Sequence, residues 1–185
     1  MVSSKADDVL RRIENDVWRR WYPIIGPRKG RVLADLVRRN RPKRILEVGT
    51  LIGYSAITMC KELGFDAEMV TIEIDDQEAE IARRNIEEAE IKPEVKVIAG
   101  DALEIIPRLE GEFDMVFIDA AKNEYLDYLR LVEDKIHEGS LIIADNVGPR
   151  AYATGDYLGY VRRSGRYESR FVPVGGDGME VSIKL

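Results

Sequence analysis

The sequence predicts an α/β fold in which a mostly parallel sheet is covered by helices on both faces. Apolar, β-rich runs alternate with helical patterns through the middle of the chain, at residues 44–48, 68–74, 94–99, 113–119 and 140–144. Strands that alternate with helices in this way are joined by right-handed crossovers and lie parallel. The runs are almost continuously apolar, as expected for strands that are buried on both faces.

Helical patterns fill the intervals between these strands, at residues 54–63, 75–90, 102–109 and 123–136. Residues 75–90 show the pattern well, because Ile81 and Ile86 lie on one side and acid–base pairs lie elsewhere. Ahead of the first strand, residues 7–21 and 28–40 have amphipathic patterns on either side of a proline-containing segment. We therefore expect two helices before the sheet begins.

At the end of the chain, the pattern of apolar side chains changes from a helical period to a period of two. Residues 167–174 and 179–185 alternate apolar and polar side chains, and the glycine-rich stretch 175–178 between them is a turn signal. We expect a hairpin that ends the sheet with an antiparallel strand. Residues 1–185 are expected to form a single domain, with N-terminal helices in 1–43 and the sheet core in 44–185.

The composition excludes several classes of protein. With one cysteine, Cys60, there is no disulfide framework or cysteine cluster for zinc, and we expect this thiol to be buried on a helix. The single histidine, His137, argues against a His-rich metal site and a Ser-His-Asp triad. No apolar run approaches the roughly 20 residues that span a bilayer. Residues 1–20 are charged throughout, unlike a signal peptide, so we expect a cytoplasmic protein without a membrane partner.

Charge is distributed unevenly along the chain. Residues 1–44 hold 13 basic and 5 acidic residues, a net charge of +8, whereas the remainder holds 15 basic and 29 acidic residues, a net charge of −14. A basic segment on an acidic body can meet an anionic partner such as RNA. The more ordinary interpretation is a pair of amphipathic helices with solvated arginine faces. These helices could also form the seam of a homodimer.

In such a sheet, ligands bind beyond the carboxyl ends of the strands. The first strand is followed by Gly49 and Gly53, a G-x-x-x-G pattern in which Leu51 replaces the glycine that would admit a pyrophosphate. Acidic residues stand at this end of the sheet, namely Glu47, Glu73 and Asp101. Taken singly, each could be a helix cap or a surface charge. Together they suit a cationic adenosine without phosphate, such as S-adenosylmethionine.

A second group of polar residues follows the fourth and fifth strands. Asp119 ends one strand, and Asp145 and Asn146 end the next. Adjacent parallel strands would bring these three side chains together, and a set of oxygen donors suits Mg²⁺, or else Mn²⁺ or Ca²⁺. Lys122 lies three positions after Asp119 and could accept a proton beside such an ion. The alternative is a capped strand end with an Asp-Asn turn.

The chain resembles the metal-dependent O-methyltransferase family that includes catechol and caffeoyl-CoA O-methyltransferases. The resemblance runs from about residue 21 to the C-terminus and is carried by PIIGPRKG at 23–30, ILEVGTLIGYSA at 45–56, IEID at 72–75, FIDAAKNEY at 117–125 and ADNV at 144–147. It implies a Rossmann-like class I methyltransferase fold with a seven-stranded, mostly parallel sheet. It also implies transfer of a methyl group from S-adenosylmethionine to a hydroxyl of a vicinal-dihydroxy aromatic or similar small molecule.

The resemblance also implies roles for individual residues. Cofactor binding would fall to Ile25, Glu47, Gly49, Thr50, Gly53, Ser55, Glu73, Asp101, Ala102 and Asp119. The metal would be held by Asp119, Asp145 and Asn146. Lys122 would be the general base, with Asp119 beside it in the catalytic centre, and the acceptor would meet Lys122, Asn146 and Trp21.

The sequence departs from catechol O-methyltransferases at one wall of the acceptor pocket. Ala120 and Ala121 stand where those enzymes have a histidine and a tryptophan, which leaves room for a larger acceptor. A second interpretation, which draws on the open pocket and on the basic N-terminal segment, is a tRNA methyltransferase acting on a hydroxylated uridine. A more distant one is a non-catalytic or NAD-binding Rossmann protein, which the missing middle glycine argues against.

Overall fold

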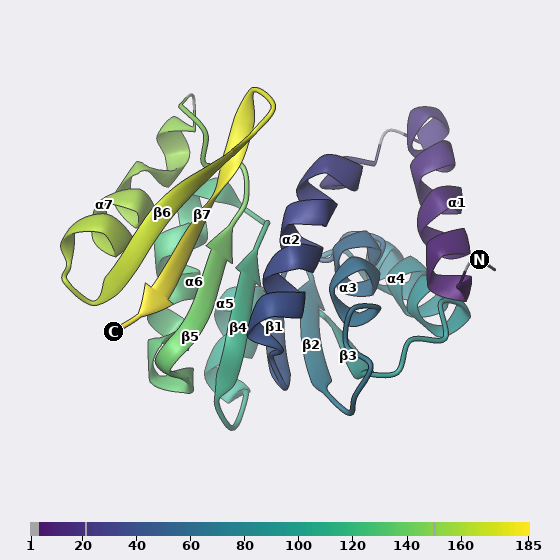
Figure 1. The fold of residues 1–185 in the computed structure, drawn as a ribbon, viewed down its shortest axis with the longest axis horizontal. Helices are drawn as coiled ribbons and strands as arrows, with labels where there is room; N and C mark the ends of the chain where they lie inside the picture. Colours follow the sequence, from purple (N-terminus) through teal and green to yellow (C-terminus); the bar gives the residue numbers. More distant parts are fainter. Residues whose placement is uncertain (1–3, 21, 150) are drawn as a thin grey trace. The chain divides into compact units, whose positions relative to one another are not determined.

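The computed structural model describes residues 4–20, 22–149 and 151–185 of the chain (Figure 1). Within these residues, seven strands form one sheet in the order β3-β2-β1-β4-β5-β7-β6. The strands are β1 (Arg44–Val48), β2 (Glu68–Glu73), β3 (Glu94–Ala99), β4 (Phe113–Ile118), β5 (Ile136–Ala144), β6 (Tyr167–Val174) and β7 (Asp177–Lys184). The helices are α1 (Lys5–Arg20), α2 (Gly26–Asn40), α3 (Tyr54–Cys60), α4 (Asp76–Glu88), α5 (Ala102–Ile105), α6 (Tyr125–Val132) and α7 (Gly155–Arg163). The predicted fold class is confirmed.

The chain divides into two compact units. One unit comprises residues 1–43 and 50–100, and the other comprises residues 44–49 and 101–185. The predicted N-terminal helices thus belong with α3, α4, β2 and β3. The prediction of a single domain over residues 1–185 stays a prediction.

In the first unit, α2 packs on α3, and α1 packs on α3 and α4. These helices bury apolar side chains that recur at helical spacing, such as Val9 and Ile13 on α1 and Leu33 and Val37 on α2. β2 and β3 pair in parallel from Glu68↔Glu94 to Glu73↔Ala99. The cysteine on α3 is buried, as predicted.

In the second unit, β1, β4 and β5 are parallel neighbours. Their centres are fully buried, with Leu46, Phe117 and Ile143 at 0% exposure. β5 begins at Ile136, four residues earlier than predicted, because Ile136 continues the ladder opposite Phe113. The helix predicted over 123–136 is shorter, since α6 is flanked by 3₁₀ turns at 122–124 and 133–135.

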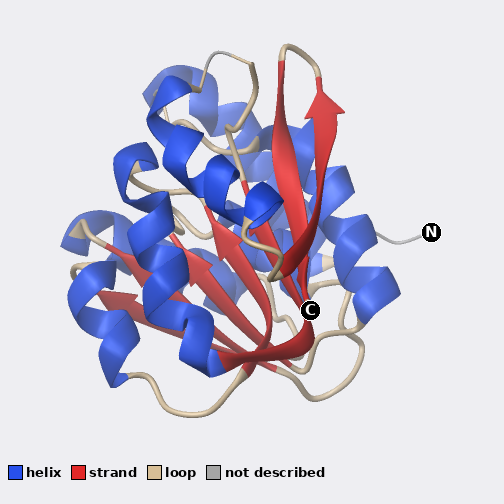
Figure 2. Cartoon of the chain, turned by 90° about the vertical axis from the view of Figure 1, so that its left-hand side faces the viewer, coloured by secondary structure: helices blue, strands red, loops and turns tan. Residues whose placement is uncertain are grey.

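The C-terminal hairpin of the second unit is present as predicted. β7 pairs antiparallel with β5, and β6 pairs antiparallel with β7 (Figure 2). A helix that the sequence did not indicate, α7, packs against β6. Two of the nine residues of α7 are glycines, and only Tyr157 and Val161 of this helix are buried, so its apolar stripe is too narrow to give a helical signal.

No helix within residues 4–20, 22–149 and 151–185 combines the length and apolarity needed to cross a bilayer.

Candidate active site

The predicted oxygen donors follow two paired strands of the second unit. Ile118 of β4 lies opposite Ala144 of β5, so Asp119 and Asp145 come directly after a matched pair. The backbone N–H of Asp145 donates to the carbonyl of Ile118 at 2.9 Å, which continues the ladder past the strand ends. Asp145 is 1% exposed, and the side chain of Asp119 is 17% exposed. The structure therefore places both carboxylates at one edge of the sheet.

Lys122 and Tyr125 connect these two strand ends. The Nζ of Lys122 donates to Oδ1 of Asp119 at 2.8 Å and to the hydroxyl of Tyr125 at 2.8 Å. That hydroxyl donates to the backbone carbonyl of Asp145 at 3.1 Å. Burial raises the pKa of Tyr125, and the charges of Asp119 and Asp145 raise it further. The charges of both carboxylates thus disfavour ionisation of the same phenol, that of Tyr125. The sequence motif included Tyr125, but nothing in it indicated this bridging role.

Asn146 has a left-handed backbone conformation, with φ of 56°. Its Nδ2 donates to Oδ2 of Asp177 at 2.8 Å, and the backbone N–H of Gly148 donates to Oδ1 of the same carboxylate at 2.9 Å. Asp177 begins β7 and was predicted only as part of a turn. No signal in the sequence would have linked it to Asn146, since 31 residues separate them.

The donor set contains two carboxylates and one amide. In the described part of the chain, no group of three or more His, Cys, Asp and Glu side chains is arranged to hold a metal ion. The set Asp119, Asp145 and Asn146 therefore depends on the amide as its third member. Oxygen atoms from all three side chains are nevertheless the kind that hard divalent cations prefer.

The start of the glycine loop packs closely against Asp119. Gly49 has φ of 89°, and a Cβ there would overlap the carbonyl oxygen of Asp119 and lie 2.9 Å from its carbonyl carbon. Only glycine fits this conformation and this approach. Glu47, two residues earlier on β1, is fully buried opposite Phe117.

In the first unit, Glu73 holds the rest of the loop. Its Oε2 accepts from the backbone N–H of Leu51 at 2.7 Å, and its Oε1 accepts from the N–H of Asp75 at 3.1 Å. Leu51 has φ of 52°, so it takes a glycine-like conformation without being glycine. Gly53 has φ of 86° and precedes α3. Thr50 and Ser55 are buried on either side of it.

The remaining predicted residues have simpler surroundings. Asp101 caps α5 by accepting from the N–H of Leu103 at 2.8 Å, and Ala102 is buried. Ile25 is half-buried at the start of α2. Trp21 lies outside the described residues.

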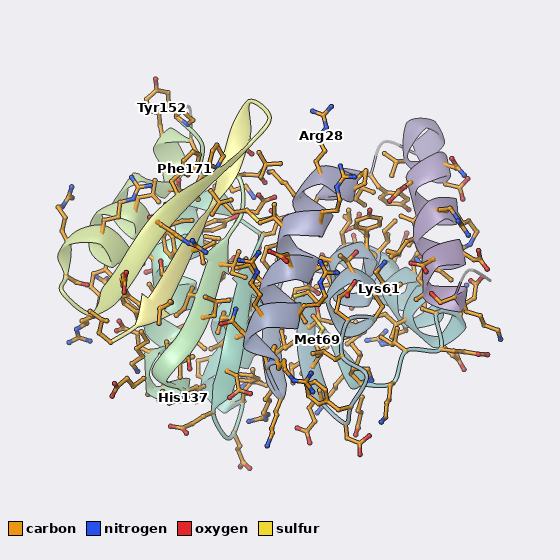
Figure 3. All side chains as sticks on the ribbon, viewed as in Figure 1. Arg28, Lys61, Met69, His137, Tyr152 and Phe171 are labelled. Carbon is orange, nitrogen blue, oxygen red and sulfur yellow. The ribbon has the colours of Figure 1, made fainter. Side chains whose placement is uncertain are left out.

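A depression of about 430 Å³ lies in the second unit, and Val147, the residue after Asn146, is one of the residues that line it. Its walls include the exposed aromatic side chains of Tyr152 and Phe171, which are labelled in Figure 3. Val147, Pro149 and Leu158 supply further apolar surface, and Arg162 lies at the side. An aromatic molecule could be accommodated on such a surface.

Solved structures with similar architecture define the class of protein. The O-methyltransferase of Bacillus cereus, determined in complex with SAH, superposes with a TM-score of 0.86 at 27% identity, covering 97% of this chain and 91% of that one. TomG of Streptomyces achromogenes, involved in tomaymycin synthesis and determined with SAM, gives 0.80 at 28% identity, covering 96% and 90%. The fold is therefore that of a class I methyltransferase.

Sequence comparison identifies the family. The O-methyltransferase family profile matches residues 2–152, so the chain belongs to that family. It is 37% identical over 147 residues to the catechol O-methyltransferase of Niastella koreensis, covering 76% of this chain and 66% of that protein. It is 36% identical over 156 residues to that of Bos taurus, covering 80% and 56%. The chain thus spans between about half and two thirds of the length of these relatives.

Proposed function

We propose that the chain is an S-adenosylmethionine-dependent and divalent-metal-dependent O-methyltransferase that acts on a vicinal-dihydroxy aromatic compound. The observation that carries this proposal is the hydrogen bond from Lys122 to Asp119, at the strand end next to the one that carries Asp145 and Asn146. Membership of the O-methyltransferase family supports it, as does similarity to proteins named catechol O-methyltransferase.

We propose that the glycine loop and the following strand ends hold the cofactor. The residues are Ile25, Glu47, Gly49, Thr50, Gly53, Ser55, Glu73, Asp101, Ala102 and Asp119. Each carboxylate oxygen of Glu73 accepts one backbone hydrogen bond and keeps a second lone pair, so this residue can still accept from ribose hydroxyls. The loop lacks the second glycine of the dinucleotide pattern, which favours a cofactor without a pyrophosphate.

The residues at the ends of β4 and β5 fit a hard cation such as Mg²⁺, Mn²⁺ or Ca²⁺. Two carboxylates supply a charge that matches a divalent ion, and the amide nitrogen of Asn146 is directed to Asp177, which leaves its oxygen for the cation. When bound, the ion would act as a Lewis acid that makes the acceptor hydroxyl easier to deprotonate.

Lys122 would act as the general base. Asp119 and Tyr125 fix the position of its nitrogen, so the amine, once neutral, can take the proton of the acceptor hydroxyl. The oxygen then forms a bond to the methyl carbon while the bond from sulfur to that carbon breaks. The products are a methyl ether and S-adenosylhomocysteine, with the proton on Lys122. An unassisted phenol titrates near pH 10, so this proton transfer is needed at neutral pH.

The acceptor would be aromatic and could carry an apolar substituent. Residues 147–149 follow Asn146 directly and line the depression that contains Tyr152 and Phe171. The alanines at positions 120 and 121, in place of larger side chains, fit an acceptor bulkier than catechol.

The RNA alternative rests on the basic N-terminal segment. In the first unit, several of these positive charges are paired: Arg12 with Glu88 at 2.6 Å, Arg39 with Asp35 at 2.7 Å, and Arg38 with Glu62 at 3.0 Å. These pairs favour the interpretation of solvated helix faces. Binding of RNA would weaken steeply as salt rises from 50 to 200 mM by roughly 10³-fold, whereas binding of a neutral catechol would not.

A methyl-transfer screen tests the proposal. Labelled S-adenosylmethionine is incubated with catechol, a caffeoyl ester or bulk tRNA, with Mg²⁺ or with a chelator. We expect label on a small catechol-type acceptor and loss of transfer with the chelator. Transfer that survives the chelator would overturn metal dependence, and transfer to tRNA alone would overturn the acceptor class.

Homodimerisation and cytoplasmic location stay predictions. Light scattering would test whether the protein is a dimer.

A further inference from the structure

Hydrogen bonds connect the turn at the start of β7 to the loop after β5, and three of them are made by residues 146–148. Two of them reach the carboxylate of Asp177, from the side-chain nitrogen of Asn146 and from the backbone N–H of Gly148. The third runs from the backbone N–H of Val147 to the carbonyl of Gly178 at 3.2 Å. Three consecutive residues of the loop are therefore bound to two consecutive residues of the hairpin.

The loop also packs closely against Asp177. A Cβ at Gly148 would lie 2.5 Å from Oδ1 and 2.9 Å from Cα of Asp177. Asn146 has a left-handed backbone that few residues other than glycine, asparagine and aspartate adopt readily. The side chain of Asp177 thus sets the backbone path on either side of Val147.

The same carboxylate decides which end of the Asn146 amide faces the strand ends. A carboxylate only accepts hydrogen bonds, so it selects the NH₂ end of the amide. The carbonyl oxygen must then point to the other side. Without that acceptor, the amide could rotate and present N–H groups, which cannot bind a cation.

We propose that Asp177 is a positioning residue that orients the Asn146 oxygen as a metal ligand, an inference that rests on the proposed metal-dependent function. Side chains that orient metal ligands in this way are commonly worth 10–100-fold in metal affinity. Asp177 also receives a bond from Gly148, so a single residue controls both the rotamer of Asn146 and the loop that carries it.

The test measures Mn²⁺ affinity by electron paramagnetic resonance, with S-adenosylhomocysteine affinity and thermal unfolding measured in parallel. Asp177→Asn offers one acceptor oxygen for two donors, so we expect Mn²⁺ to bind about 10–100-fold more weakly while S-adenosylhomocysteine binding is unchanged. Asp127→Asn removes the same charge from an exposed position on α6 and should bind Mn²⁺ like the wild type. A merely structural role would lower the unfolding temperature without a selective loss of Mn²⁺ affinity.

A reciprocal exchange gives a second test. In Asn146→Asp combined with Asp177→Asn, the amide at position 177 can donate to the carboxylate at position 146 and still accept from Gly148. This double variant should bind Mn²⁺ more tightly than either single variant. In Asn146→Asp alone, the carboxylates at positions 146 and 177 would repel each other and could not form a hydrogen bond. If Asp177→Asn does not fold, the comparison of the double variant with Asn146→Asp decides.

The outcomes separate the two claims. A wild-type protein that does not bind Mn²⁺ would overturn the metal-dependent function, and the role of Asp177 with it. Wild-type binding that Asp177→Asn leaves unchanged, or a double variant no tighter than Asn146→Asp, would overturn the positioning role alone.

Discussion

Lys122 and Asp119 are joined by a 2.8 Å hydrogen bond from Nζ to Oδ1. Polar residues at the end of a strand can also serve only to cap the helix that follows, so the bond alone does not define their role. The lysine is one third exposed and the aspartate is largely buried. A single ion pair that is still partly open to solvent contributes little to stability. Its position beside the ends of two paired strands suggests a chemical role, and this role can be tested.

Lys122→Met should abolish turnover while cofactor affinity is kept. Removal of a general base typically costs a factor of roughly 10²–10⁴ in rate. The measurement is the rate of methyl transfer together with the dissociation constant of S-adenosylhomocysteine. Lys96→Met, on the exposed side of β3, is the matched control and should keep its activity. Turnover of Lys122→Met near the wild-type rate would remove the assigned role.

Asp145→Ala should abolish both turnover and Mn²⁺ binding. This carboxylate is nearly fully buried and supplies half of the negative charge of the predicted donor set. Titration with Mn²⁺, monitored by electron paramagnetic resonance, measures the loss directly. A variant that folds, lacks Asp145 and binds Mn²⁺ as the wild type does would show that this residue is not a ligand.

The strand ends could be predicted from the sequence because two simple rules fix them. Apolar runs between helices identify parallel strands, and parallel neighbours end at the same edge, so the sequence alone predicts that Asp119 and Asp145 lie near each other. The C-terminal hairpin could be predicted because apolar and polar side chains alternate on both sides of a glycine-rich turn.

Contacts between distant segments could not be predicted in this way. Nothing in the sequence links Asp177 to Asn146, or Glu73 to the N–H of Leu51, since these bonds depend on the path of loops. Local patterns also carried too little signal for α7, with its two buried residues. The sequence thus indicates which residues reach the edge of the sheet, but not which residues hold them there.

Gly49→Ala should destabilise the protein strongly. The new methyl group would overlap the backbone carbonyl of Asp119, and φ of 89° disfavours any side chain. Overpacking and backbone strain together cost about 3 kcal/mol or more. Gly64→Ala is the control, because no heavy atom lies within 4 Å of a Cβ there, and it should change stability by less than about 0.5 kcal/mol. Urea unfolding measures both, and equal stabilities would contradict the close approach.

Arg162→Met should destabilise the second unit by leaving a buried charge unpaired. Glu180 is 0% exposed and accepts two hydrogen bonds from Arg162, at 2.7 and 2.6 Å. Breaking a buried pair by removing one partner costs about 3 kcal/mol, at the lower end of the usual range because Arg162 is partly exposed. The double variant that adds Glu180→Gln should recover part of the loss. Urea unfolding at pH 7 tests both variants. A single variant as stable as the wild type would contradict the argument.

His137 should make stability depend on pH through the neutral range. This residue, at the start of β5, is labelled in Figure 3. Its Nδ1 lies 2.8 Å from the carbonyl oxygen of Glu138, and its Nε2 lies 3.0 Å from Oδ1 of Asp114. Both partners accept hydrogen bonds, so they favour the doubly protonated ring. The carbonyl of Glu138 and then Asp114 raise the pKa of His137 above its ordinary value of 6.5, with a smaller contribution from Glu112.

Because the folded-state pKa is raised, the stabilisation is fully present below pH 6.5 and is lost as pH rises through the folded-state pKa. The side chains of His137 and Asp114 are 41% and 36% exposed, so solvent screens the pair and the effect should stay below about 1 kcal/mol. The measurement is urea unfolding of the wild type and of His137→Gln at pH 6 and at pH 8.5. The wild type should be the more stable protein at the lower pH, and the difference should shrink at the higher one. A difference that is constant, or that grows with pH, would show that the ring is not held as a cation.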